Sequence, residues 1–186
     1  MPYLYFDESI RDNGGFIVGA LVVTKTDVSA AIVESWSKLG LGPAHEYKSS
    51  GIKSGDIAGQ QQRSTLRGLL QSSRLALTVC PSSDRRNLGL HCVALVEQLI
   101  QRGRIDPANG HLLVDQNIHV PASRRDSLSQ LGMDVRVNQD SRVVAGLQLA
   151  DHAAHALGGM LLEELGVVRK IVKAGEDSGY DPNQEI

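Results

Sequence analysis

The chain has 186 residues, of which 41% are hydrophobic and 22% are charged, a composition typical of a folded domain with a substantial core. Its 19 Lys and Arg residues nearly balance its 21 Asp and Glu residues, so the formal net charge is −2. This balance argues against a protein that coats nucleic acid indiscriminately, because such proteins bind through a surplus of cationic side chains. It is compatible with an enzyme that carries a local basic groove.

The first half of the chain predicts a β-hairpin, two helices and a third strand. Turn residues at 12–15 separate a β-prone run at 3–6 from a nearly continuous apolar run at 16–24. Because 16–24 is apolar on both faces, we expect helices to cover its sheet. The next predicted elements are helices at 27–39 and from Asp56 to about Ser73, and a strand at 75–80.

The second half predicts two further strands that alternate with helices. These elements are a helix from about Leu88 to Arg102, a strand at 111–115, a short helix at 121–131, a strand at 133–137 and a long helix that ends near Gly166. Residues 175–186 carry four acids and no Lys or Arg, and we expect them to form a mobile tail. No repeat or linker divides the chain, so we predict one domain over residues 1–174.

Neither export nor membrane insertion is predicted. No basic leader precedes an apolar segment, and no apolar run approaches the roughly 18 residues of a membrane span. Cys80 and Cys92 lie outside any C-x-x-C motif. We therefore expect a cytoplasmic protein with free thiols, no membrane partner and no zinc site built on cysteine.

Three aspartates are predicted to meet at one edge of the sheet. Asp7 and Asp115 each follow a strand, and the ends of adjacent parallel strands project to the same edge. Asp151 lies in the small-residue segment 144–157, a predicted helix that can approach the sheet closely. Carboxylates held together repel one another unless cations bind between them, and hard oxygen ligands suit Mg²⁺ or Mn²⁺. Two such ions can support phosphodiester hydrolysis.

The same stretches resemble a known family. They are the opening Tyr5-Phe6-Asp7-Glu8-Ser9, the strand at 15–20, Glu46-x-Lys48, and Ser141 followed by Gly-Leu-Gln-Leu-Ala-Asp at 146–151. From residue 3 to about residue 160, the chain resembles the bacterial and phage family catalogued as domain of unknown function 3800. The resemblance implies an α/β, RNase H-like fold. Its five-stranded mixed sheet would have three antiparallel strands first, flanking helices, and a helical insertion between strands two and three.

The resemblance also implies the chemistry of the site. RNase H-like nucleases carry acidic ligands on the first strand, a helix or loop, the fourth strand and the last helix, which here correspond to Asp7, Glu46, Asp115 and Asp151. These four carboxylates would bind Mg²⁺ or Mn²⁺ in a metal-dependent nuclease that cleaves DNA or RNA. Lys48 would neutralise the scissile phosphate or pair with the acidic cluster.

Alternatives stay open for the fourth ligand and for the function. Glu97, on the helix before the fourth strand, competes with Glu46, and Glu8 and Asp140 are further candidates. A non-catalytic RNase H-like binding or regulatory module, or a hydrolase of small nucleotides, competes with the nuclease, since one fold hosts many functions. Aromatic residues are 4% of the chain, which argues against a broad base-stacking platform.

Several basic residues outside the acidic set are candidates for contacts to a phosphate backbone. They are Arg63, Arg67, Arg74 and the pairs Arg85-Arg86 and Arg124-Arg125. His152 and His155 follow Asp151 on the same predicted helix. We expect both histidines to be partly exposed helix residues rather than ligands.

Overall fold

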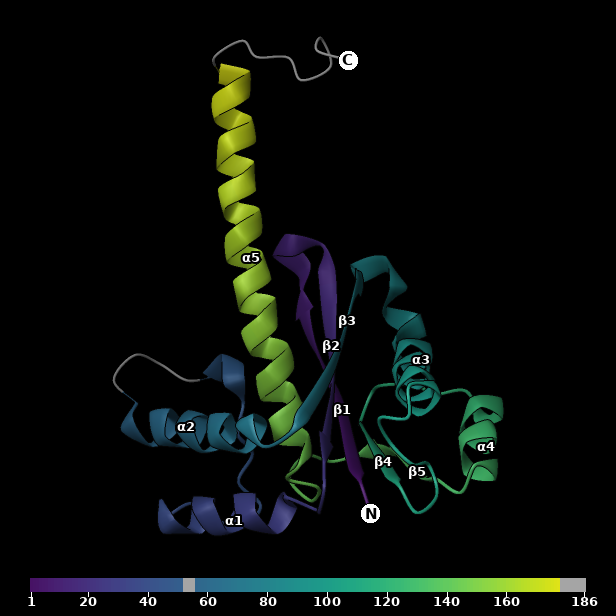
Figure 1. Ribbon diagram of the computed structural model, residues 1–186. Helices are drawn as coiled ribbons and strands as arrows, with labels where there is room; N and C mark the ends of the chain where they lie inside the picture. The colour runs from purple at the N-terminus through teal and green to yellow at the C-terminus, as the bar shows by residue number, and fades with distance from the viewer. Residues whose placement is uncertain (52–55, 178–186) are drawn as a thin grey trace.

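A mixed five-stranded sheet forms the centre of the computed structural model, which describes residues 1–51 and 56–177 (Figure 1). The strands are β1 (Tyr3–Arg11), β2 (Phe16–Thr24), β3 (Arg74–Pro81), β4 (His111–Asp115) and β5 (Asp134–Gln139). They lie in the order β3-β2-β1-β4-β5. The first three pair antiparallel, whereas β4 pairs in parallel with both β1 and β5.

Helices pack on both faces of this sheet. They are α1 (Ser29–Lys38), α2 (Ile57–Gln71), α3 (Leu88–Gln101), α4 (Ala122–Gln130) and α5 (Leu147–Asp177), with short 3-10 helices η1 (Asp12–Gly14), η2 (Ser49–Gly51) and η3 (Ser82–Asn87). The first, second and last α-helices cover one face, where Trp36 and Leu66 are fully buried. The other two cover the opposite face, where Val96 and Leu128 are buried.

Local sequence explains several of these elements. β2 is buried along its whole length, as its continuous apolar run predicts for a strand covered on both faces. α2 begins where the side chain of Asp56 accepts a hydrogen bond from the backbone N–H of Gly59 at 2.9 Å, the expected N-cap. The strands predicted at 16–24 and 111–115 have the predicted bounds.

β1 is longer than predicted, because Asp7-Glu8-Ser9 continue the strand instead of ending it. Antiparallel pairing with β2 extends to Arg11–Phe16. In the described residues, the parallel pairing with β4 stops earlier, at Phe6–Val114. The two strands that flank β1 therefore leave it at different points, and this fork lies at Asp7.

The last helix also differs from its prediction. α5 does not end near Gly166 but continues to Asp177, and its second half projects beyond the sheet (Figure 1). A glycine inside a helix costs only about 1 kcal/mol relative to alanine, which the surrounding helix-forming residues can offset. Residues 175–177, predicted as part of a tail, are helical, and 178–186 lie outside the described residues. No helix in the described ranges combines the length and apolar character that crossing a membrane requires.

Candidate functional site

An acidic site forms at the fork between β1 and β4. Asp7 directly follows the last parallel pair, Phe6–Val114, and Asp115 is the next residue of β4. Because side chains alternate along a strand, Asp7 shares the face of Tyr5, which packs against α5. Asp7 is 7% exposed, and Asp115 is half-buried at the end of its strand.

Burial and mutual repulsion change the titration of these carboxylates. Burial raises the pKa of Asp7 well above its ordinary value, and the charges of Asp115 and Glu8 add to this effect. Burial, followed by the charge of Glu8, raises the pKa of Asp115 to about 7, while Lys48 acts in the opposite direction. Burial likewise raises the pKa of Asp151, which lies close enough to affect Asp7. Such a group of carboxylates is stabilised by a cation between them.

A glycine allows α5 to bring Asp151 to this fork. A Cβ atom on Gly146, the residue directly before α5, would lie 2.2 Å from the ring of Tyr5, so the chain enters the helix against the sheet at a position that excludes any side chain. Asp151 lies five residues further along the chain. Its Oδ2 accepts a hydrogen bond from the backbone N–H of Ser49 at 3.2 Å. The small-residue pattern of this helix therefore positions the third aspartate.

Gln148, within the same helix, anchors the loop at 45–49. Its Oε1 accepts hydrogen bonds from Trp36 Nε1 and from the backbone N–H of Tyr47, both at 3.0 Å. Its Nε2 donates to the carbonyl oxygen of Ser141 at 2.9 Å. Gln148 is 1% exposed, and a buried amide with its hydrogen bonds satisfied fixes the segments around it.

Glu46 and Lys48 occupy the rim of the site. Lys48 Nζ lies 2.8 Å from Glu46 Oε1, and the hydroxyl of Ser141 donates to the same oxygen. Burial by itself would raise the pKa of Glu46, but these two partners lower it overall. The pKa of Lys48 is raised by Glu46 and by the charges of Asp151 and Asp7, which outweigh its desolvation. Lys48 thus pairs with Glu46 and is near enough to Asp151 and Asp7 for their charges to affect it.

Glu8 is more closely associated with the aspartates than the sequence suggested. Burial raises the pKa of Glu8, and its charge raises the pKa of both Asp7 and Asp115. Its Oε2 is buried without a hydrogen-bond partner among the described residues. The sequence offered one signal for this residue, its position next to Asp7.

Two other acidic candidates lie outside this group. Glu97 is on α3, which covers the opposite face of the sheet, and its carboxylate lies 3.8 Å from Arg124. Asp140 pairs with Arg142 at 2.6 Å, and this partner lowers the pKa of Asp140 to about 2. The structure therefore places Glu46, and not Glu97, beside the three aspartates.

A basic cavity of about 400 Å³ adjoins the acidic site. Ser49, which binds Asp151 through its backbone N–H, also lines this cavity. Arg11 of β1, which donates a hydrogen bond to the carbonyl oxygen of His155, and Arg63 and Arg67 of α2 line it and outnumber the one acidic lining residue, Glu163 of α5. Ser49 therefore joins the acidic site to a cavity that carries guanidinium groups, which bind phosphate oxygens well.

His152 and His155 line the same cavity, and the expectation that both are partly exposed is wrong for the first. His155 is half-buried, but His152 is 4% exposed because Tyr47 packs over it. The Tyr47 hydroxyl and His152 Nδ1 are 3.1 Å apart. Burial, with Arg67 and Arg63 nearby, lowers the pKa of His152 to about 4, so its imidazole is neutral at pH 7.

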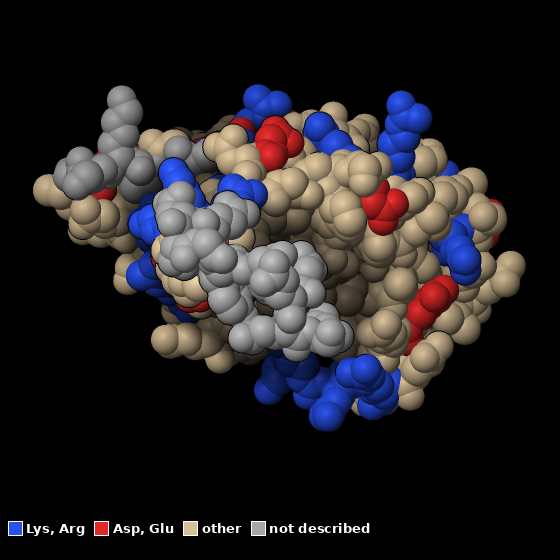
Figure 2. All heavy atoms as spheres, turned by 90° about the horizontal axis from the view of Figure 1, so that it is seen from above, with Lys and Arg blue, Asp and Glu red and all other residues tan. Residues whose placement is uncertain are grey.

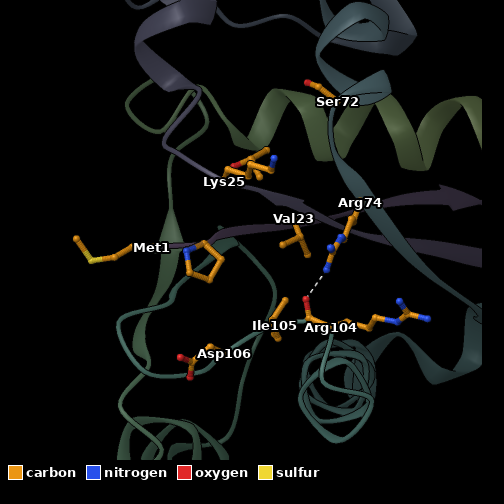
Figure 3. A pocket seen from close by; sticks show the side chains of 10 residues that line it. Met1, Val23, Lys25, Ser72, Arg74, Arg104, Ile105 and Asp106 are labelled. Atoms are coloured by element: carbon orange, nitrogen blue, oxygen red, sulfur yellow. Dashed lines mark hydrogen bonds between the residues drawn. The ribbon is translucent and has the colours of Figure 1, made fainter.

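A separate hollow at the start of β1 holds none of the predicted site residues. Figure 3 shows Arg74 and Arg104 meeting across it, where Arg74 donates a hydrogen bond to the carbonyl oxygen of Arg104 at 2.5 Å. Arg74 therefore makes a contact within the chain at this hollow. Figure 2 shows that Lys and Arg side chains gather in separate groups on the face viewed there, consistent with the balanced net charge.

Comparison with known proteins establishes the fold. No family model and no curated protein sequence matches this chain. Among solved structures, a chain of the complex of PCNA with RNase HII from Archaeoglobus fulgidus matches with a TM-score of 0.53 at 15% identity. The match covers 98% of this chain and 92% of that chain. The fold is RNase H-like.

Within the RNase H-like fold, the helical insertion predicted between strands two and three consists of α1, η2 and α2. Asp7, Asp115 and Asp151 come from β1, β4 and α5, the elements that the family resemblance implied. The donor set consists of oxygen atoms from carboxylates whose negative form is disfavoured without a counter-charge. Oxygen donors of this kind suit a hard divalent cation such as Mg²⁺ or Mn²⁺, and the carboxylates would move closer together to bind one ion jointly, because their ligand atoms do not all lie within 4.8 Å of one another.

Proposed function

We propose that this protein is a metal-dependent nuclease and a member of the domain of unknown function 3800 family. Asp7, Asp115 and Asp151 would bind two Mg²⁺ or Mn²⁺ ions, with Glu46 and Glu8 completing or orienting the site. One observation carries the proposal: three buried or half-buried aspartates from distant parts of the chain converge where β1 and β4 part, and their pKa values are raised. The RNase H-like fold, which RNase HII shares, supports it.

In this proposal, some residues of the chain would bind the cations and others would bind the phosphate. The bound ions would supply activation of a water molecule and stabilisation of the leaving oxygen. Lys48, which is half-exposed and paired with Glu46, would contact a non-bridging oxygen of the scissile phosphate. Neutralising that oxygen would favour attack on the phosphorus and would release Lys48 from its ion pair with Glu46.

The basic cavity supports a nucleic acid strand as the substrate. Arg11, Arg63 and Arg67 lie next to the acidic site, where the phosphate adjacent to the scissile one would pass. One guanidinium group can bind two phosphate oxygens at once, and contacts to phosphate do not distinguish one base from another. We therefore expect cleavage with weak sequence preference. A polymer presents phosphates to both sites at once, whereas a nucleoside monophosphate presents one.

Cleavage assays on a matched set of variants test this proposal. Wild type, Asp7→Asn and Asp126→Asn would be incubated with labelled single- and double-stranded DNA, RNA and RNA–DNA hybrid in Mn²⁺ or Mg²⁺. Asp126 is exposed on α4, on the other face of the sheet, and its variant controls for the loss of one carboxylate. We expect Asp7→Asn to lose at least about 10³-fold in rate while Asp126→Asn remains active, since a lost ligand removes most of the metal's contribution.

Other outcomes would change the conclusion. Unchanged cleavage by Asp7→Asn would rule out the acidic site as the origin of the activity. Tight binding of an oligonucleotide by wild type without turnover in either metal would instead assign a non-catalytic binding module. Calorimetry with Mn²⁺ in the presence of oligonucleotide would then show whether the aspartates bind an ion at all.

A further inference from the structure

A second group of metal-ligating side chains lies outside the acidic site. Cys80 at the end of β3, Asp84 in η3 and His91 in α3 each offer one ligand atom, and these atoms all lie within 4.8 Å of one another. The three residues fall within twelve positions of sequence but have none of the usual cysteine-motif spacings, so the sequence predicted no zinc site here. The turn between β3 and α3 brings them together.

The arrangement of the three side chains suits an ion that enters from solvent. Cys80 is 5% exposed and lies beneath the other two, whose side chains are each 32% exposed. His91 Nε2 lies 2.6 Å from Asp84 Oδ2, and Asn87 donates a hydrogen bond to the second oxygen of the same carboxylate. The carboxylate is therefore oriented by a neighbour, as is common for residues that ligate metals.

This group is separate from the acidic site. Strand alternation and the core contacts place Cys80 on the sheet face that α3 covers. Asp7 and Asp151 lie on the opposite face, which α5 covers. The two groups also differ in chemistry, because one is built from oxygen ligands alone and the other combines sulfur, nitrogen and oxygen.

We propose that Cys80, Asp84 and His91 bind one Zn²⁺ ion and leave its fourth position open to solvent. Zinc favours thiolate and imidazole ligands in tetrahedral geometry, whereas Mg²⁺ and Mn²⁺ favour oxygen. Bonds of about 2.0 to 2.3 Å to zinc place neighbouring ligand atoms roughly 3.3 to 3.6 Å apart. Side-chain rotations that move the ligand atoms of the partly exposed Asp84 and His91 by about 1 Å would reach that spacing.

Proton balance is part of the proposal. Without an ion, burial and the nearby Asp84 carboxylate raise the pKa of the Cys80 thiol, which therefore keeps its proton. Binding of Zn²⁺ would displace that proton to solvent and replace the hydrogen bond between His91 and Asp84 with two bonds to the metal. The ion would compensate the burial of the thiolate, and metal binding would release protons.

Cobalt substitution tests this site independently of any nuclease activity. Co²⁺ would be titrated into the full-length protein with Mg²⁺ in excess to occupy the acidic site. We expect a thiolate-to-cobalt charge-transfer band in the near ultraviolet that saturates at one equivalent and disappears when Zn²⁺ is added. Cys80→Ser should lose the band, and Cys92→Ser should keep it, since Cys92 is the other thiol of the chain and lies fully buried in the core. Asp7→Asn should also keep it.

Variants of the two partly exposed ligands test the site even if Cys80→Ser fails to fold. Asp84→Asn and His91→Gln alter partly exposed side chains, and each should weaken Co²⁺ binding at least about 10-fold, as loss of a ligand or its partner does. A wild-type protein without the thiolate band would overturn the proposal. The proposal would also be overturned if both variants bound Co²⁺ with the affinity of wild type, which would indicate an ion held by the thiol alone.

Discussion

The repulsion among the site carboxylates predicts that Asp115→Asn stabilises the metal-free protein. Asparagine has nearly the shape of aspartate but carries no charge, so this substitution removes the charge at position 115 with little change in packing. The pKa of Asp115 is raised from 3.8 to about 7. Each pKa unit corresponds to about 1.4 kcal/mol, so the full shift would correspond to about 4 kcal/mol for a shielded group. Because Asp115 is only half-buried, solvent screening reduces our expectation to about 1–2 kcal/mol.

The sign of the pH dependence follows from the direction of the shift. The native state binds a proton at Asp115 more tightly than the unfolded state does, so protonation favours folding. The stabilisation that comes from protonated Asp115 is fully present below pH 3.8 and is lost as pH rises through about 7. Wild type should therefore lose stability between pH 5 and pH 8 relative to Asp115→Asn. Asp7 should add to this loss, since burial and the charge of Asp115 raise its pKa in the same direction.

Urea denaturation at pH 5 and pH 8, with EDTA or with Mn²⁺, measures this effect. With EDTA, the free energy of unfolding of Asp115→Asn should exceed that of wild type by about 1–2 kcal/mol at pH 8 and by much less at pH 5. With Mn²⁺ at pH 8, wild type should gain stability by mass action and the variant should not. An Asp115→Asn variant equal to wild type at both pH values would refute the electrostatic account of the site.

Two further predictions concern the basic cavity and the packing of α5 on the sheet. The double variant Arg63→Gln and Arg67→Gln should weaken oligonucleotide binding. It should also lower the slope of log affinity against log salt concentration by about 0.7–0.9 for each phosphate that is no longer neutralised, which fluorescence anisotropy across a salt series would measure. Arg102→Gln, on the far side of the sheet, should change neither quantity. Gly146→Ala should cost about 1–3 kcal/mol in thermal or urea unfolding, because its methyl group would overlap a buried ring. Gly166→Ala, in an open position within α5, should instead stabilise by up to about 1 kcal/mol, and destabilisation there would contradict the packing argument.

The sequence predicted the elements of the fold well where the signal was local. The apolar run of β2 and the N-cap at Asp56 depend on neighbouring residues, and both agree with the structure. The end of β1 depends on its neighbours in space. Asp7 looked like the end of a strand because polar residues follow it, but β2 continues to pair with those residues while β4 departs.

The sequence predicted the aspartates of the candidate site better than it predicted the residues around them. Asp115 and Asp151 were identified from a strand end and a small-residue helix, patterns that lie within a few residues of each side chain. Helical periodicity does not show which face of the sheet a helix covers, so the sequence leaves Glu97 as an alternative to Glu46. The position of α3 on the opposite face removes that alternative. His152 was expected to be partly exposed, because its burial depends on Tyr47, more than a hundred residues earlier in the chain.

The fork that holds the three aspartates also determines when the site can exist. Asp7 lies on β1, whereas Asp151 lies on α5, which follows all five strands along the chain. Pairing between β1 and β4 and the docking of α5 both join segments more than a hundred residues apart, and such contacts form late in folding. A nascent chain with four of its strands still lacks the third carboxylate. We therefore expect the growing polypeptide to be unable to assemble this acidic site until α5 has been made and has docked on the sheet.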